Sequence, residues 1–356
     1  MLKQIIHRWE RKLSTRDNNR VTRPFEWGIE FLEPEYLART NGHRPDAREI
    51  IHKFNERAIA DSHNYFKPPA TPEFYFEGEY VKFKSTVETP FEQNNTVYAR
   101  YFPVPPSNGN LNGSRAHEVE RAEGRAVVVL PHWNARPVEH VATCQWLNRT
   151  GIAALRLTLP YHEQRMLPGF ERADYMVSAN VGRTLQSMRQ AVLDTRSAID
   201  WLFAQGYTRI GLLGTSLGSC IGFLAFIHDK RLRAGVYLHV SSYFGDVVWE
   251  GITTAHVRRG LESKLTREEV RKVWLAISPN SYINRLKHDN RRGLLISARY
   301  DLSFTPELSR LLFDECDRHE VRLDRAIIPC GHYTLGRVPY KFYVGYRLVS
   351  YFRKHL

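Results

Sequence analysis

Short apolar runs without polar alternation recur in the second half of the chain and predict strands that are buried on both faces. Six runs of this kind lie between residues 126 and 331: AVVVLP, IAALRLTLP, RIGLLG, AGVYLHV, GLLISARYD and RAIIPCG. Between them lie helical stretches, of which 183–205 is the clearest, because its apolar side chains recur at three-, four- and seven-residue steps. This alternation of strands and helices predicts a parallel α/β sheet.

The first third of the chain follows a different pattern. Two segments rich in β-branched and aromatic residues, YFEGEYVKFKSTVETP and NNTVYARYFPV, predict an antiparallel hairpin at the sheet edge, followed by a polar loop, SNGNLNGSRAHEVERAEGR. Residues 1–72 are more charged, and a helical period places Ile5, Trp9 and Leu13 on one face. We therefore expect an N-terminal extension, 1–72, packed on a main domain, 73–356.

One interval between predicted strands is too long for a simple crossover. It covers residues 241–292, more than fifty positions between AGVYLHV and GLLISARYD. Thr266 and Glu269 form a capping-box signature, which predicts a helix from there to about residue 276. We expect a small helical cap over the carboxyl-terminal edge of the sheet, with Trp249 contributing to a substrate pocket. The alternative is a set of extra helices on the outside of the domain.

The stretch GTSLG interrupts an apolar run with small and polar residues. It lies between the strand RIGLL and the helix CIGFLAFIH, where a sharp turn needs small residues two positions before and after its centre. Gly214 and Gly218 meet that requirement. The turn would expose the hydroxyl of Ser216 beside a helix N-terminus, which favours negative charge. Ser216 is therefore the candidate nucleophile, with Ser219 as the alternative.

A serine hydroxyl becomes a good nucleophile only when a base takes its proton. Asp301 ends the strand run GLLISARYD, and His332 follows the run RAIIPCG. The carboxyl ends of parallel strands meet at one crevice, so the three side chains are expected there together. His332 would act as the base and Asp301 would hold its imidazole in the correct tautomer. Asp246 is the alternative acid.

With this set of residues the chain resembles the α/β-hydrolase superfamily, and more specifically its serine esterase and dienelactone-hydrolase-like members. The resemblance covers residues 73–356 and rests on GTSLG, on QAVLDTRSAIDWL before the elbow strand, on SPNSYINRL before GLLISARYD, and on CGHYT. It implies a mostly parallel eight-stranded sheet, hydrolysis of esters or related acyl compounds, and no metal or organic cofactor. It does not identify the substrate.

An acyl-transfer site also needs two backbone N–H groups directed at the developing oxyanion. The elbow supplies the N–H of Leu217. The second donor is expected in the loop after AVVVLP, which contains His132, Trp133 and Asn134. Family members often have His-Gly before the donor residue, and this chain has Trp133 in place of the glycine. Matching by position makes Asn134 the donor, and a shifted loop would use Trp133.

The stretch LPYHEQR, residues 159–165, also follows a predicted strand and offers polar groups to the same edge. Tyr161 and His162 are candidates for substrate binding, and Arg165 for gripping an anionic group, because its guanidinium suits carboxylate or phosphate. The alternative is a rigid loop whose polar groups satisfy the backbone. His132 is a further candidate contact, but His132 and His162 lack a suitably spaced third ligand for a metal.

Charge and cysteine content narrow the choice of partners. The 356-residue chain has 51 Lys and Arg against 38 Asp and Glu, a net charge of +13. The positive electrostatic potential of such a chain attracts anionic lipids, nucleic acid or acidic substrates. Because the sequence has no block of five basic residues, we expect no nucleic-acid partner. Four dispersed cysteines predict reduced, buried thiols. With no signal-peptide core near Met1, the expected location is the cytoplasm.

The leading hypothesis is a serine hydrolase that cleaves a small-molecule or lipid ester through an acyl-enzyme. Three alternatives stay open: an acyltransferase with the same triad, a lipid-ester hydrolase that docks on anionic membranes, and a non-catalytic binding protein on this fold. The sequence does not reveal the oligomeric state.

Overall fold

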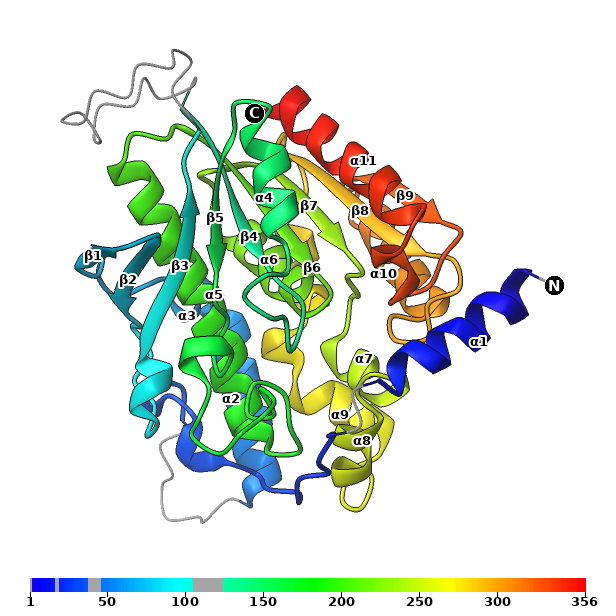
Figure 1. Cartoon of the computed structure of the whole chain (residues 1–356). Coiled ribbons are helices and arrows are strands. Elements are labelled where there is room, and N and C mark those ends of the chain that lie inside the picture. The colour runs from blue at the N-terminus through cyan, green and yellow to red at the C-terminus, as the bar shows by residue number, and fades with distance from the viewer. Residues whose placement is uncertain (1, 17–18, 38–45, 105–123) are drawn as a thin grey trace.

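The computed structural model describes residues 2–16, 19–37, 46–104 and 124–356, and its strands form one twisted sheet (Figure 1). Within these residues the sheet has nine strands in the order β1-β2-β3-β5-β4-β6-β7-β8-β9. The strands are β1 Phe74–Glu77, β2 Tyr80–Lys84, β3 Thr96–Phe102, β4 Arg125–Leu130, β5 Ala153–Leu157, β6 Arg209–Thr215, β7 Leu232–Leu238, β8 Arg292–Ala298 and β9 Asp324–Ile328.

The predicted α/β architecture is confirmed, with one strand more than the eight expected. Strands β4 to β9 run parallel, whereas β1, β2 and β3 pair antiparallel and β3 joins the rest through an antiparallel contact with β5. The extra strand arises because the segment expected to be one strand turns back at Gly78, whose φ of 61° few other residues adopt. Most of the polar loop predicted after the hairpin, 105–123, lies outside the described residues.

Helices cover both faces of the sheet, with α4 and α11 on one side and α5, α6 and α10 on the other (Figure 1). Strand β4 shows why the apolar runs lack alternation. Its Val127 and Val129 belong to the core under α4 and α11, while Ala126 and Val128 belong to the core on the opposite face. The helices are α1 Leu2–Ser14, α2 Ala47–Ala60, α3 Ser62–Tyr65, α4 Val141–Asn148, α5 Val181–Ala204, α6 Leu217–His228, α7 Phe244–Glu250, α8 Ala255–Leu261, α9 Arg267–Val273, α10 Pro306–Arg318 and α11 Tyr340–His355.

The N-terminal residues contribute three helices, of which α1 and α2 contact different parts of the molecule and the short α3 follows α2. Helix α1 does form, and Leu13 is buried as predicted, but Ile5 and Trp9 are 56% and 37% exposed while Ile6 and Glu10 are buried. This face of α1 turns inward because the Glu10 carboxylate accepts backbone hydrogen bonds from the loop after β9. Helix α2 instead packs on the insert, where Asn55 bonds the backbone of residues 273 and 276.

The insert, 241–292, forms α7, α8, α9 and three short 3-10 turns. The predicted capping box is present: the Thr266 hydroxyl accepts from the N–H of Glu269, and the Glu269 carboxylate accepts from the N–H of Thr266. The helix ends at Val273, three residues earlier than predicted. In Figure 1 these helices lie together at the lower right, near the carboxyl ends of the central strands.

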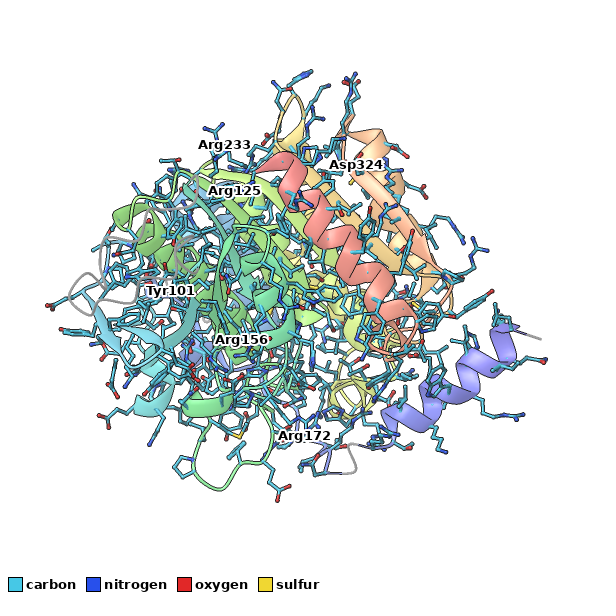
Figure 2. All side chains as sticks on the ribbon, turned by 45° about the horizontal axis from the view of Figure 1, so that its top comes forward. Tyr101, Arg125, Arg156, Arg172, Arg233 and Asp324 are labelled. Carbon is cyan, nitrogen blue, oxygen red and sulfur yellow. The ribbon has the colours of Figure 1, made fainter. Side chains whose placement is uncertain are left out.

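Figure 2 distinguishes the two ends of the sheet. Arg125, Arg233 and Asp324, which lie at or near the start of β4, β7 and β9, gather at the top, while Arg172 lies at the opposite end. All four cysteines are buried and free. No helix among the described residues has the length and apolar character to cross a bilayer.

Candidate active site

The turn between β6 and α6 has the steric constraint that the sequence predicts. A Cβ added to Gly214 would lie 2.3 Å from the carbonyl oxygen of Gly218, and one added to Gly218 would lie 2.3 Å from that of Leu130. Ser216 sits at the corner with φ 54° and ψ −118°, a conformation that is costly for a residue with a side chain. This backbone conformation directs the Ser216 hydroxyl toward the edge of the sheet where the parallel strands end.

The structure brings Ser216, His332 and Asp301 together. The Ser216 Oγ lies 3.1 Å from His332 Nε2, and His332 Nδ1 lies 3.2 Å from Asp301 Oδ2. The second carboxylate oxygen, Asp301 Oδ1, accepts the N–H groups of Ser303 and Phe304 at 2.7 and 2.8 Å. The Phe304 ring also stacks parallel to the His332 imidazole, with centroids 5.5 Å apart. The imidazole is therefore fixed at both nitrogens and on one face.

A second histidine, which the sequence analysis missed, shares the same carboxylate. His239 directly follows β7, and its Nδ1 lies 2.8 Å from Asp301 Oδ2. Burial and then the neighbouring His332 lower the pKa of His239, which favours its neutral form. Its position at the carboxyl end of a buried strand, the same signal that selected His332, could have identified it.

The electrostatic field around His332 favours the protonated imidazole. Burial alone would lower the pKa of His332, but the carboxylates of Asp301 and Glu10 outweigh burial and raise it. Glu10 comes from α1 and accepts the N–H groups of Tyr333 and Thr334 at 3.0 and 2.8 Å. Nothing in the local sequence around Glu10 indicates this role, because its partners lie more than 320 residues away.

The alternative acid and nucleophile are placed elsewhere. Asp246 is fully buried on α7, where both its oxygens accept from Arg271 at 3.0 and 2.6 Å. Asp301, and not Asp246, is therefore the carboxylate that pairs with His332. Ser219 donates its hydroxyl to the carbonyls of Ser216 and His239, which turns it away from the imidazole.

The loop after β4 corrects the assignment of the second oxyanion donor. The N–H of Asn134, the donor by position, already donates to His162 Nε2 at 2.9 Å. The N–H of Trp133 has no acceptor among the described residues, and neither does that of Leu217. The Trp133 indole donates to Ala173 O and stacks on His256, so the large side chain is held outside the turn. Trp133 and Leu217 are therefore the candidate donors.

The side chains of Tyr161, His162 and Arg165 are buried and do not line the cavity at Ser216, which corrects their assignment to substrate. Arg165 is fully buried and donates to Asp194 Oδ2 at 2.9 Å and to the carbonyls of Asn94 and Thr158. Tyr161 is buried against aromatic rings, with φ 64°, away from the cavity.

His162 supports the oxyanion loop and does not compete as a base. Its Nδ1 lies 2.8 Å from Pro160 O and its Nε2 accepts from Asn134, so both ring nitrogens are occupied. Burial lowers the pKa of His162 to about 3, which keeps the ring neutral and able to accept. This pairing excludes His162 from a metal site with His132.

A cavity of about 860 Å³ opens at Ser216, a volume typical of small-molecule sites. His132 lines it, as predicted, together with Trp133 and Asn134. The insert also lines it, but through residues other than Trp249: Phe244, Val247, Val248, Thr253 and Thr254. Trp249 is half-buried, and Arg258 lies over its ring at 5.0 Å from the centroid.

One set of side chains could geometrically hold a metal ion. Ligand atoms of His239, Asp301 and His332 lie within 4.8 Å of one another. Asp301 and His332 are already paired with each other and with Ser216, and a metal ion there would occupy one of the two His332 nitrogens that this pairing uses. We therefore interpret the cluster as an extended triad.

Comparison with solved structures identifies the fold. The model superposes on an acylaminoacyl peptidase of Pyrococcus horikoshii with a TM-score of 0.56 and 16% identity over 81% of this chain and 42% of the peptidase. An acetyl xylan esterase of Paenibacillus sp. R4 gives 0.56 and 14% over 90% and 98% of the two chains. Acetyl xylan esterase 1 of Thermoanaerobacterium sp. JW/SL YS485 gives 0.56 and 15% over 90% and 96%.

No protein-family model and no curated protein matches this chain. It spans less than half the length of the peptidase but nearly all of each acetyl xylan esterase. The chain thus has the α/β-hydrolase fold, as its motifs indicated, and its neighbours are named for esterase and peptidase activities.

Replacing Glu10 with glutamine tests the field around His332. The base must be neutral to accept a proton, so a raised His332 pKa confines activity to higher pH. Glu10→Gln removes one of the negative charges that raise the His332 pKa. The acidic limb of the pH profile of kcat/KM, measured with 4-nitrophenyl butyrate, should therefore move to lower pH. The exposed Glu35→Gln variant should leave the limb in place. A Glu10→Gln limb identical to wild type in a folded protein would contradict this role.

Removing His162 tests the support of the oxyanion loop. His162→Ala leaves the Asn134 N–H without its acceptor and lets the donor loop shift. Because oxyanion contacts form fully only in the transition state, kcat should fall about ten- to a hundred-fold with KM little changed. The exposed His63→Ala variant is the control. A raised KM with unchanged kcat would place His162 in substrate binding instead.

Proposed function

We propose that this protein is a serine hydrolase that cleaves a carboxylic ester through an acyl-enzyme. The observation that carries the proposal is the hydrogen-bonded series from Ser216 Oγ through His332 to Asp301, at 3.1 and 3.2 Å, on a strained nucleophile elbow. A neutral His332 with Nδ1–H donated to Asp301 has Nε2 free to accept the serine proton.

In the proposed first half-reaction, Ser216 Oγ attacks the ester carbonyl carbon while its proton moves to His332 Nε2. The carbonyl oxygen becomes an oxyanion that accepts from the N–H groups of Leu217 and Trp133. Collapse of the tetrahedral intermediate breaks the bond to the alcohol oxygen, which takes the proton from His332. Asp301 stays ionised, because His332 and His239 outweigh the effect of burial and lower its pKa.

In the second half-reaction, water attacks the acyl carbon while one of its protons moves to His332 Nε2. Collapse of this second tetrahedral intermediate breaks the bond to Ser216 Oγ, which takes the proton back from His332, and the carboxylic acid leaves. Acyl transfer differs only in that an alcohol or thiol replaces water at this step. A lipid ester taken from an anionic membrane is a further variant, which the exposed apolar residues Leu2, Ile5 and Trp9 on a basic helix support.

Covalent labelling tests the nucleophile and separates an enzyme from a binding protein. A fluorophosphonate probe should label the wild type, and Ser216→Ala should lose the label and several orders of magnitude in ester turnover. Ser309→Ala, a buried serine on α10, should behave like wild type. A folded Ser216→Ala that keeps its label would disprove the assignment, and absence of wild-type labelling would favour a binding protein.

The insert residues at the cavity should set acyl-chain preference. Phe244→Leu enlarges the cavity beside Ser216 and should shift preference from butyrate toward octanoate 4-nitrophenyl esters by roughly tenfold, the range that small changes in an apolar pocket produce. Trp249→Ala, outside the cavity in the same helix, should leave the ratio near the wild-type value. The reverse pattern would mean that α7 presents its other face to the substrate.

A further inference from the structure

The cavity at Ser216 is lined by an excess of cationic side chains. Five basic residues face it, and among the described lining residues Glu139 is the single acidic one. The basic residues are Arg16, Arg136, Arg172, Arg337 and Lys341. A cavity of one sign concentrates ligands of the opposite sign.

Two of the five cations have partners within the protein. Arg136 Nη2 lies 3.6 Å from Glu139 Oε1, and Arg172 Nε lies 3.7 Å from Asp174 Oδ1. Although burial favours its neutral form, contacts with His132 and with the backbone of Arg136 lower the pKa of Glu139 to about 2. Glu139 is thus ionised, and its negative charge offsets the positive charge of the neighbouring Arg136.

The other three cations, Arg16, Arg337 and Lys341, form no ion pair with any carboxylate that the structure describes. All three are exposed. Arg337 and Lys341 lie one helical turn apart, joined by a backbone hydrogen bond from Lys341 N to Arg337 O. Arg16 follows α1. The Glu10 carboxylate of that helix accepts hydrogen bonds from the backbone of Tyr333 and Thr334, a few residues before Arg337. The three cations therefore line one cavity from two neighbouring segments.

We propose that Arg16, Arg337 and Lys341 bind an anionic group of the substrate, a carboxylate or phosphate, while its ester bond lies at Ser216. This inference rests on the proposed function and names the substrate class for that site. The sequence analysis named Arg165 as the anion-binding residue, but Arg165 is enclosed by Asp194 and backbone carbonyls. The residues proposed here lie instead just after α1 and around the start of α11.

The soluble arm of the test uses two esters of equal length: the 4-nitrophenyl monoester of adipic acid, which is an anion, and its neutral methyl ester. After correction for their rates with hydroxide, the wild type should favour the anion in kcat/KM. Arg337→Gln/Lys341→Gln should lose roughly five- to thirty-fold of that preference, since each exposed charge contact contributes up to about fivefold. The preference is calculated for each variant as the ratio of its kcat/KM on the anionic ester to that on the neutral ester.

A second arm distinguishes a soluble anion from a lipid headgroup. Acyl release is measured from phosphatidylcholine vesicles with and without phosphatidylglycerol. Loss of preference only with adipate assigns the site to soluble esters, and loss only with phosphatidylglycerol assigns it to a headgroup. Both arms should weaken toward 1 M salt, where the screening length falls to about 3 Å.

The matched control is Arg258→Gln/Arg325→Gln, which also removes two positive charges, but from surface pairs with Glu262 and Asp317 outside the cavity. If this control lost the preference equally, net charge alone would explain it and the site would be refuted. The site would also be refuted if Arg337→Gln/Lys341→Gln kept the wild-type preference in both arms. Fluorophosphonate labelling of each variant separates these outcomes from failure of the proposed function, which would abolish labelling of the wild type.

Discussion

The close approach of α6 to the strands β6 and β4 is the constraint on which the site depends. Side chains at Gly214 and Gly218 would overlap backbone atoms at 2.3 Å, so only glycine allows the strand to turn into the helix there. The turn imposes a positive φ on Ser216, which is tolerated because the packing on both sides determines it. The hydroxyl and the N–H of Leu217 are thereby placed before any substrate binds, and this preorganisation is what acyl transfer requires.

The position of the candidate base, His332, depends on contacts that join the two ends of the chain. His332 lies on a loop after the last strand, and the carboxylate of Glu10 holds the backbone of that loop from the first helix. The pKa of His332 therefore reflects the docking of α1 as well as the pairing with Asp301. The same docking brings Arg16 to the cavity, so the N-terminal residues affect both the pKa of His332 and the charge of the cavity lining.

Polar residues near the site divide by whether they face the cavity or the protein interior. The 159–165 loop is the clearest example. Arg165 and His162 have the side chains expected of a substrate-binding motif, yet buried partners satisfy both of them. An unpaired charge there would carry a large desolvation penalty, and this explains why Asp194 and the backbone carbonyls surround Arg165. The loop instead holds Asn134, and with it the turn that contains the N–H of Trp133, through the hydrogen bond to His162 Nε2.

The sequence by itself determined the fold class, the elbow and the order of Ser216, Asp301 and His332, because these follow from local steric requirements and from strands whose carboxyl ends meet at one edge. It could not determine which faces of α1 and of the 159–165 loop turn inward, since partners distant in sequence decide that. Only the tertiary structure located Glu10 and His239 beside the base, replaced Asn134 by Trp133 as the free donor, and placed Trp249 outside the cavity. Each of those outcomes depends on which neighbour a polar or aromatic group meets in space, and neither spacing nor composition records that neighbour.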